Sequence, residues 1–347
     1  MKKLLTLLLL LASIVPVLAC STFLINRNGQ LVFGRNYDWV SGNGILMVNS
    51  AGLLKTSFVP GSKSISWMAR YGSVSFNQFG KEMPHGGMNE KGLVVELMWL
   101  QGTSYPATDE RAAVNELQWI QYQLDNCASI EEVIATDKLL RIDRNNAAPL
   151  HYLIADASGK AATIEFLNGA MVVHKGNELR FPVLTNSTYE SSLLQLNPAT
   201  RSMEPSNSFD RFTTACSLLQ QYQSGNSSIP PVDYAFTMLS KVSQSQYTKW
   251  SIVYDITNKK IEFITLGNEK RRSISFADLD FKCNGTGKFV DINAALQGDL
   301  TNQLAPLNAE QNLNVIRQSA IESRTHVQIA EESIVALGEY FSTVKCK

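Results

Sequence analysis

The feature of this 347-residue chain that most restricts its folding is the junction at Cys20, where an apolar leader stops and a strand pattern begins. Residues 1–19 combine Lys2 and Lys3 with an apolar stretch and end in the small residue Ala19, which is typical of a secretory signal peptide. The apolar stretch is shorter than the roughly 20 residues that a membrane-spanning helix needs. We therefore predict cleavage after Ala19, a mature chain that starts at Cys20, and a periplasmic or secreted protein.

A β-hairpin is predicted directly after this junction. Residues 21–26 alternate in polarity and are rich in β-branched and aromatic types, and residues 31–39 repeat that pattern. The dipeptide Asn28-Gly29 between them is typical of a two-residue hairpin turn. The mature chain would therefore begin with a strand.

The remainder of the chain alternates blocks of strands with blocks of helices. The predicted elements are a buried strand at 93–100, helices at 111–127 and 129–140, three short strands within 151–175, helices at 208–222 and 231–241, and a hairpin at 251–265. A polar helical pattern then covers 308–344 and is interpreted as a packing or oligomerisation helix. This block order favours an α+β protein in layers over a doubly wound parallel sheet.

Charge and motif content narrow the function classes. Basic and acidic residues balance at 31 each, so nothing indicates binding to nucleic acid or to an anionic membrane, and the expected partner is a small molecule. The chain has no GxSxG, GxxxxGK[ST] or HExxH motif, and its four histidines are scattered, so we expect no metal and no cofactor. The segment at 84–89, "PHGGMN", is interpreted as a glycine-rich turn, and His85 as a structural residue rather than a catalytic base.

The cysteine count leaves one thiol unpaired. Cys127, Cys216, Cys283 and Cys346 could form two disulfides in any of three connectivities, or could stay as buried thiols. Cys20 is then the odd cysteine, and an unpaired cysteine in a secreted chain is a candidate reactive thiol.

Two chemistries fit a cysteine at the first position of a mature chain. An α-amine with an ordinary pKa of ~7.7 to 8.0 can accept the proton of a thiol with a pKa of ~8.5, so Cys20 could supply both nucleophile and base. Alternatively, "VLAC" resembles a lipobox, in which the cysteine carries lipid on sulfur and an acyl group on nitrogen. In that case the protein would be a lipid-anchored periplasmic binding protein.

Arg35 and Asp38 are candidate partners of this cysteine. They are three residues apart on one strand, so both can reach the same site only at a bulge or at the strand end. A carboxylate could hold the α-amine of Cys20, while a guanidinium lowers the pKa of its thiol.

Four motifs occur in an order that resembles a known family. The motifs are "CSTFLINRNGQLVFGRNYDW", "GMNEKGL", "LTNS" and "SFDRF". The chain is thereby similar, from Cys20 to roughly Leu266, to the choloylglycine hydrolase family of N-terminal nucleophile amidohydrolases, which contains penicillin V acylases and bile salt hydrolases. The resemblance implies a four-layer αββα sandwich with antiparallel sheets, no cofactor, and a tetramer. The segment after about Phe276 carries no motif of the family, and with its helical pattern we interpret it as a helical extension from about 300 of a single domain over 20–347.

The resemblance also implies roles for the candidate residues. Cys20 would be the nucleophile, and Arg35 and Asp38 would activate it and position its amine. Asn186 of "LTNS" would donate its side-chain amide to the oxyanion, and Arg211 of "DRF" would complete the charged network.

Two tryptophans would shape the substrate site. The backbone N–H of Trp99 would be the second oxyanion donor, and Trp39 and Trp99 look like the aromatic lining of a subgroup from Gram-negative bacteria that hydrolyses penicillin V and long-chain N-acyl homoserine lactones. The expected function is an exported hydrolase that cleaves the linear amide bond of penicillin V, an N-acyl homoserine lactone or a similar N-acylated small molecule. Bile salt hydrolysis is the alternative within the family.

Overall fold

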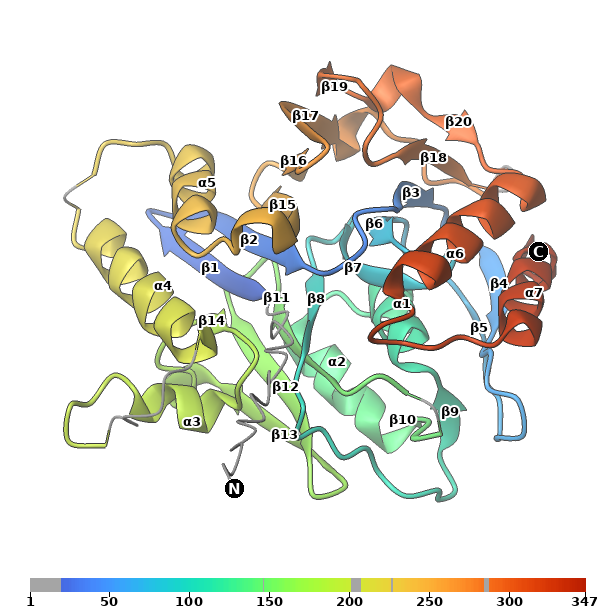
Figure 1. Cartoon of the computed structure of the whole chain (residues 1–347), viewed down its shortest axis with the longest axis horizontal. Coiled ribbons are helices and arrows are strands. Elements are labelled where there is room, and N and C mark those ends of the chain that lie inside the picture. Colours follow the sequence, from blue (N-terminus) through green and yellow to red (C-terminus); the bar gives the residue numbers. More distant parts are fainter. Residues whose placement is uncertain (1–19, 146, 201–206, 226, 284–286) are drawn as a thin grey trace, which may run out of the picture.

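The structure of the chain is a computed structural model that describes residues 20–145, 147–200, 207–225, 227–283 and 287–347. The predicted signal peptide, residues 1–19, lies outside this part of the chain. Two large β-sheets form the centre of the molecule (Figure 1).

The first sheet has seven strands and contains the predicted N-terminal hairpin. Its strands, in spatial order, are β14 (Val183–Leu184), β1 (Ser21–Arg27), β2 (Gln30–Asp38), β15 (Thr248–Asp255), β16 (Lys260–Thr265), β17 (Asn268–Ser275) and β19 (Gly298–Asp299). All neighbours are antiparallel except β17 and β19 at the edge. Asn28 and Gly29 adopt φ values of 53° and 79°, the left-handed conformation that a two-residue hairpin turn requires.

The second sheet has nine strands, all antiparallel to their neighbours. Its strands, in spatial order, are β13 (Ala170–Lys175), β12 (Ala161–Leu167), β11 (Leu150–Ala155), β8 (Val94–Trp99), β7 (Pro84–Asn89), β6 (Ser73–Asn77), β3 (Ile45–Asn49), β18 (Lys288–Asp291) and β20 (Ala305–Pro306). Two small sheets lie outside it, one formed by β9 (Ala112–Val114) and β10 (Leu140–Ile142), the other by β4 (Leu53–Thr56), β5 (Ser66–Met68) and β21 (Lys345–Cys346).

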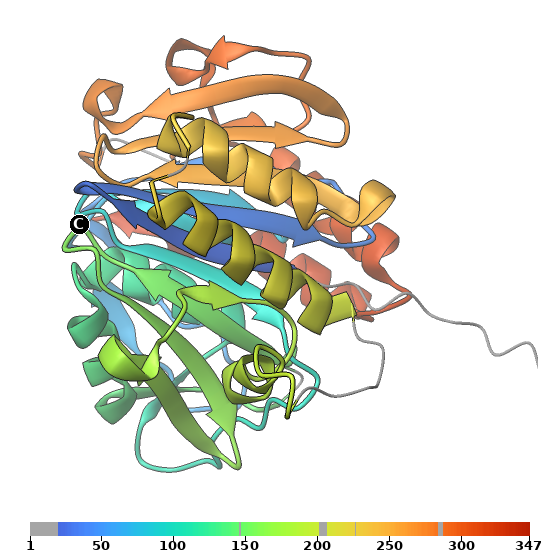
Figure 2. The ribbon, with the colours of Figure 1, turned by 90° about the vertical axis from the view of Figure 1, so that its left-hand side faces the viewer.

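Helices cover the outer faces of both sheets. On the seven-stranded sheet, α4 (Asn207–Gln223) and α5 (Pro231–Lys241) pack over β1, β2 and β15, as Figure 2 shows from the side. On the nine-stranded sheet, α1 (Glu116–Asn126) packs over β7 and β8, and α2 (Ile130–Ala135) follows it. The predicted α+β fold of four layers, with two antiparallel sheets between helices, is confirmed.

Two hydrophobic clusters explain why the layers hold together. The larger cluster joins buried side chains of both sheets, such as Phe23 of β1 and Phe76 of β6, to those of α4 and α5. The second cluster lies between the nine-stranded sheet and α1, where Trp119 packs against Tyr152 of β11. The central strands of the nine-stranded sheet therefore bury both faces, which is why β8 appears in the sequence as a nearly continuous apolar run.

Three local predictions are wrong. The helix predicted from 111 begins only at Glu116, because β9 precedes it and the side chain of Asn115 caps α1 by accepting from two backbone N–H groups. The next helix ends at Ala135 rather than reaching 140. The segment at 84–89 is the buried strand β7 and not a glycine-rich turn, because Gly86 makes room for the Glu96 side chain of β8 and Gly87 for the backbone of β6.

The C-terminal part contains two helices where the sequence showed one helical pattern. They are α6 (Ala309–Ser323) and α7 (Glu331–Tyr340), separated by a turn at 324–326 and a non-helical stretch at 327–330. A disulfide joins Cys283 to Cys346, whereas Cys127 and Cys216 are free and buried. In the part of the chain described above, no helix has both the length and the apolar character needed to cross a membrane.

Candidate active site

Cys20 lies at the start of the first strand, beside the end of the second. The β1–β2 register pairs Ser21 with Asn36, so Cys20 is next to the last residues of β2. Its thiol is buried, with only 5% of the residue exposed, and approaches the carbonyl oxygen of Asp38 at 3.9 Å. The hairpin predicted from the sequence thus places the two ends of "CSTFLINRNGQLVFGRNYD" against each other.

Arg35 reaches from β2 to the other sheet. The β7–β8 ladder ends at the pair Gly86–Glu96. Just beyond that end, the backbone carbonyls of His85 and Leu97 both accept hydrogen bonds from the Arg35 guanidinium. Nη1 donates to His85 O at 2.9 Å, and Nη2 donates to Leu97 O at 3.2 Å. Arg35 therefore lies where the ladder opens, beside Cys20.

Glu96 is the charged partner of Arg35, and the sequence interpretation missed it. Its carboxylate forms an ion pair with the guanidinium and accepts a hydrogen bond from the Tyr254 hydroxyl. Burial raises the pKa of Glu96 to about 7, although Arg35 and Tyr254 oppose the rise. The signal in the sequence was a single carboxylate inside the apolar strand "VVELMW", since a buried charge needs a partner.

Asp38 ends β2 and faces polar donors from another segment. Gln244 donates to one carboxylate oxygen at 3.0 Å, and the Thr248 hydroxyl donates to the other. The register between β2 and β15 shifts between Thr248 and Trp250, which places one extra residue of β15 opposite the end of β2. Burial raises the pKa of Asp38, and the two donors and Arg211 lower it.

Arg211 connects the nucleophile strand to the "LTNS" segment. From α4, Nη1 donates to the carbonyl oxygen of Cys20 and, at 2.6 Å, to the Ser21 hydroxyl. Nη2 donates to Asn186 Oδ1 at 3.3 Å, while Nε donates to Asn207 at 2.6 Å. This guanidinium therefore fixes both the backbone of Cys20 and the orientation of the Asn186 amide.

The Asn186 amide and the Trp99 backbone meet at the open end of the nine-stranded sheet. Asn186 Nδ2 donates to Trp99 O at 2.7 Å. In an antiparallel pair, backbone groups point alternately toward the partner strand and away from it. Leu100 N donates to Pro149 O, directly before β11, so by this alternation the N–H of Trp99 points away from β11. It points to the β7 side of β8, where the pairing of β8 with β7 has already ended at Glu96. The two predicted oxyanion donors therefore lie together.

The electrostatics of Cys20 call for a base close to the sulfur. Burial raises the pKa of the Cys20 thiol, Arg35 lowers it, and Asp38 raises it further. The buried thiol therefore stays protonated at neutral pH unless a neighbouring group takes the proton. His85 does not fit this role, because burial and the charge of Arg35 lower its pKa to about 3.

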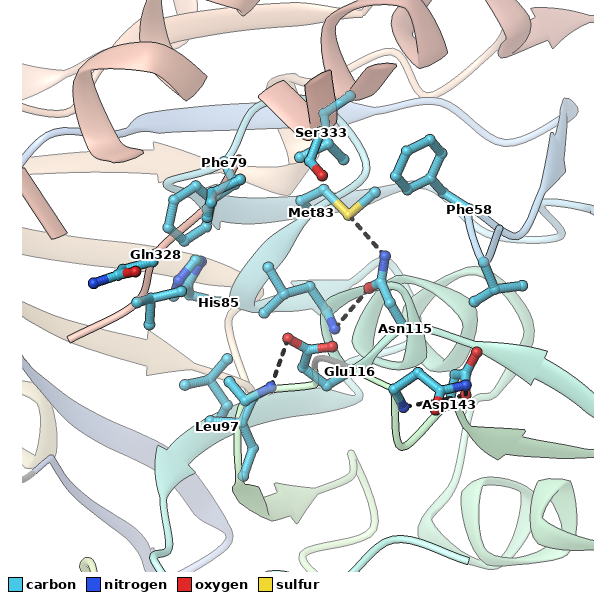
Figure 3. Close-up of a pocket in the computed structure, with 18 of the residues that line it drawn as sticks. Phe58, Phe79, Met83, His85, Leu97, Asn115, Glu116, Asp143, Gln328 and Ser333 are labelled. Atoms are coloured by element: carbon cyan, nitrogen blue, oxygen red, sulfur yellow. Dashed lines mark hydrogen bonds between the residues drawn. The ribbon is translucent and has the colours of Figure 1, made fainter. Parts of the chain in front are cut away.

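Cys20 opens into a cavity of about 740 Å³. Trp39 and Trp99 line it near the thiol, with ring centroids 5.9 Å apart. Figure 3 shows the more distant part, where Phe58, Phe79 and Met83 border the space together with the polar side chains of Asn115, Glu116 and Asp143. All seven residues predicted for the site therefore border or contact one region. Within the described ranges, no cluster of His, Cys, Asp or Glu could hold a metal ion.

Two antiparallel sheets between helices, with a cysteine leading into the first strand, define an N-terminal nucleophile hydrolase fold. A family profile described as linear amide C-N hydrolases, choloylglycine hydrolase family, matches residues 20–230, more than half of the chain. The chain belongs to this family.

Individual relatives agree with this assignment. The chain is 30% identical over 198 residues to penicillin V acylase from Pectobacterium atrosepticum, covering 52% of this chain and 52% of that protein. It thus spans about half the length of the curated relative it matches. The structure of penicillin V acylase from Agrobacterium tumefaciens superposes with a TM-score of 0.71 at 25% identity, over 83% of this chain and 98% of that one.

Two variants of the conjugated bile acid hydrolase from Clostridium perfringens share the fold. Their TM-scores are 0.65 and 0.67 at 17% and 18% identity, and in both cases 80% of this chain and 98% of theirs are covered.

Proposed function

We propose that the mature protein starts at Cys20 and hydrolyses the amide bond of an N-acylated small molecule, with the Cys20 thiol as nucleophile. The observation that carries this proposal is that Arg35 and Asp38 lie within electrostatic range of the Cys20 thiol, and Arg211 bonds both the Cys20 backbone and Asn186, at the edge of a cavity. The family profile begins at this same residue, which supports a mature chain that starts there.

The first step transfers the thiol proton to the α-amine of Cys20, and the sulfur attacks the amide carbonyl carbon. The C–N bond then breaks, the leaving nitrogen takes the proton from the α-ammonium, and a thioester remains. Water, deprotonated by the same amine, attacks the thioester, releases the carboxylic acid and restores the thiol. One residue therefore serves as nucleophile, base and acid.

The negative charge on the carbonyl oxygen would be stabilised by two donors. The Asn186 amide carries two N–H groups, of which one donates to Trp99 O. We assign its second N–H and the backbone N–H of Trp99 to the oxyanion. Asp38 would hold the α-ammonium form of Cys20, and Arg35 would stabilise the thiolate.

Processing is a requirement of this mechanism. Before cleavage, the nitrogen of Cys20 is an amide bonded to Ala19, and an amide nitrogen does not accept a proton at neutral pH. The unprocessed chain should therefore be inactive. We propose that residues 1–19 direct export and that their removal in the periplasm or outside the cell produces the active amine.

The substrate class rests on the cavity and on the relatives. A volume of about 740 Å³ suits a small molecule. The penicillin V acylase names of two relatives support a phenoxyacetyl amide, and the apolar lining also suits the fatty acyl chain of an N-acyl homoserine lactone. At 17% and 18% sequence identity, the likeness to the bile acid hydrolases supports the fold alone. Conjugated bile salts are therefore the competing substrate class to include in the assays.

Two measurements test the proposal. Cys20→Ala in the processed chain should remove hydrolysis of penicillin V and of N-acyl homoserine lactones, while the control Cys216→Ala, a buried thiol away from the cavity, should keep it. Retained activity in Cys20→Ala would refute the nucleophile assignment. Mass spectrometry of the mature N-terminus distinguishes the enzyme from the lipid-anchored binding protein, since lipidation would add mass to Cys20 and an unmodified Cys20 would exclude it. Light scattering of the purified protein tests the predicted tetramer.

A further inference from the structure

One wall of the cavity comes from the end of the chain. Residues 327–330 and, from α7, Glu332, Ser333, Ala336 and Leu337 line the same space as Cys20. Figure 3 shows Gln328 and Ser333 among the side chains at the cavity. We refer to residues 327–337 as the C-terminal wall. The family profile ends at residue 230, so this wall lies outside the residues that the profile matches.

The wall is anchored at its beginning by α6. Asn43 donates to Val315 O at 3.1 Å and to Ser319 Oγ at 2.8 Å, and Trp39 Nε1 donates to Ser323 Oγ at 2.9 Å. Trp39 directly follows Asp38, so the last turn of α6 is bonded to the strand end that carries the proposed catalytic carboxylate.

A second anchor follows the wall. The Tyr340 hydroxyl donates to Thr56 O at 2.7 Å and accepts from Gln118 Nε2 at 2.9 Å. Beyond it, β21 pairs with β4, and Cys346 is bonded to Cys283. Because one end is bonded to the segment after β2 and the other to β4 and α1, the wall has a defined position against the cavity.

The chemistry of the lining indicates what the cavity holds. The wall contributes the apolar residues Ile329, Ala336 and Leu337 beside the polar Gln328, Glu332 and Ser333, and other segments contribute further apolar residues, namely Phe58, Val59, Pro60, Phe79, Met83 and Leu117. Aromatic rings continue this surface toward the nucleophile, since the Trp39 ring lies 5.4 Å from the His326 ring and 5.9 Å from the Trp99 ring. The apolar part of this lining favours a hydrocarbon group over a polar leaving amine.

We propose that the C-terminal wall determines which acyl groups the cavity accepts, with Ile329, Ala336 and Leu337 as the residues that limit acyl length and bulk. This inference rests on the proposed function, in which the acyl carbon is bonded to Cys20 Sγ. Short acyl groups would occupy only the part beside Trp39 and Trp99, whereas long ones would contact the wall.

Two neighbouring residues of α7 provide a matched test. Ala336 lines the cavity, while Val335 is 39% exposed and does not line it. The full-length chain is expressed so that processing can occur, and Ala336→Phe and Val335→Phe are compared on the p-nitroanilides of butanoic, octanoic and dodecanoic acids. Ala336→Phe should lower kcat/KM for the dodecanoyl substrate at least about tenfold relative to the butanoyl one, and Val335→Phe should leave that ratio near the wild-type value. Equal ratios in both variants would overturn the inference.

A binding measurement separates this inference from the proposed function. In the Cys20→Ala background, tryptophan fluorescence is titrated with dodecanoate and with butanoate. If Ala336→Phe weakens the binding of dodecanoate but not of butanoate, the result supports acyl selection by the C-terminal wall. This holds even if no anilide is hydrolysed and the proposed function fails. Unchanged dodecanoate binding in Ala336→Phe contradicts it. Ile329→Phe, which adds bulk from the non-helical stretch, repeats the test if Ala336→Phe disturbs α7, as judged by its melting temperature.

Discussion

Arg35 of β2 and Glu96 of β8 form an ion pair in which neither side chain has any exposed surface. The two strands belong to different sheets, so the pair joins the sheets next to Cys20. An unpaired buried charge is costly, and each partner therefore depends on the other for its burial. Mutations at Glu96 should consequently act on Arg35 and, through it, on the thiol.

The first prediction concerns the pH dependence of stability. The folded-state pKa of Glu96 is about 7, whereas in the unfolded chain it is close to 4.5. Between these values the folded protein keeps a proton that the unfolded chain has released, so the free energy of unfolding falls as the pH rises through this window. The contribution of Glu96 to stability should be full below about pH 4.5 and should decrease by about 3 kcal/mol up to about pH 7.

Urea unfolding of the wild type and of Glu96→Gln across this pH window measures the effect. Subtracting the two curves removes the contribution of every other titrating group. The wild type should lose stability relative to the variant as the pH rises, and a difference that does not change with pH contradicts the prediction.

A second prediction concerns Gly86, which is opposite Glu96 in the β7–β8 ladder. A Cβ atom at this position would collide with the Glu96 carboxylate. Gly86→Ala should therefore displace the ion pair, destabilise the fold by about 1 to 3 kcal/mol and reduce turnover. Gly102→Ala is the control, because its Cβ would meet no atom within 4 Å. Thermal unfolding and a steady-state assay of both variants check it, and equal behaviour of the two would count against the prediction.

A third prediction separates catalysis from binding at Asn186. If its amide stabilises the oxyanion, Asn186→Ala should lower kcat by about 100-fold to 1,000-fold with little change in KM. Ser187→Ala is the matched control, since the Ser187 hydroxyl bonds to Ser208 rather than to the site. A rise in KM with unchanged kcat would instead assign Asn186 to ground-state binding.

A fourth prediction concerns the disulfide. The bond between Cys283 and Cys346 closes a loop with a sequence separation of 63 residues and anchors the C-terminal wall. Its removal in Cys283→Ser/Cys346→Ser should lower the free energy of unfolding by about 2 to 4 kcal/mol. Guanidinium unfolding with and without reductant tests this: reductant should destabilise the wild type and leave the double variant unchanged. A wild type insensitive to reductant would show that the bond contributes no stability.

Local patterns in the sequence were sufficient for the layered α+β class and for the nucleophile strand, while the four-layer arrangement came from the family resemblance. The Asn28-Gly29 turn fixes the hairpin register, and that register alone brings Cys20 beside Asp38. The resemblance added Asn186 and Arg211, which are far from Cys20 in the sequence and meet it only through the folded layers.

The parts that sequence patterns missed depend on contacts between distant segments. Glu96 looked like one residue of a buried strand, because nothing local shows that Arg35 reaches it from the other sheet. Gln244 and Thr248 bond to Asp38 only because β15 pairs with β2. The C-terminal helical pattern indicated helices but not the cavity against which they pack.

The distribution of thiols has a practical consequence. Cys127 and Cys216 are buried away from the cavity, and burial raises the pKa of the Cys127 thiol to about 12 and that of Cys216 as well, while Cys283 and Cys346 are bonded to each other. Among the described residues, Cys20 is thus the one thiol that a small alkylating reagent entering the cavity would meet. Labelling of the native protein should saturate at one equivalent per chain, so the stoichiometry of alkylation counts the chains whose Cys20 thiol is free, and comparing it with turnover separates processed from unprocessed molecules.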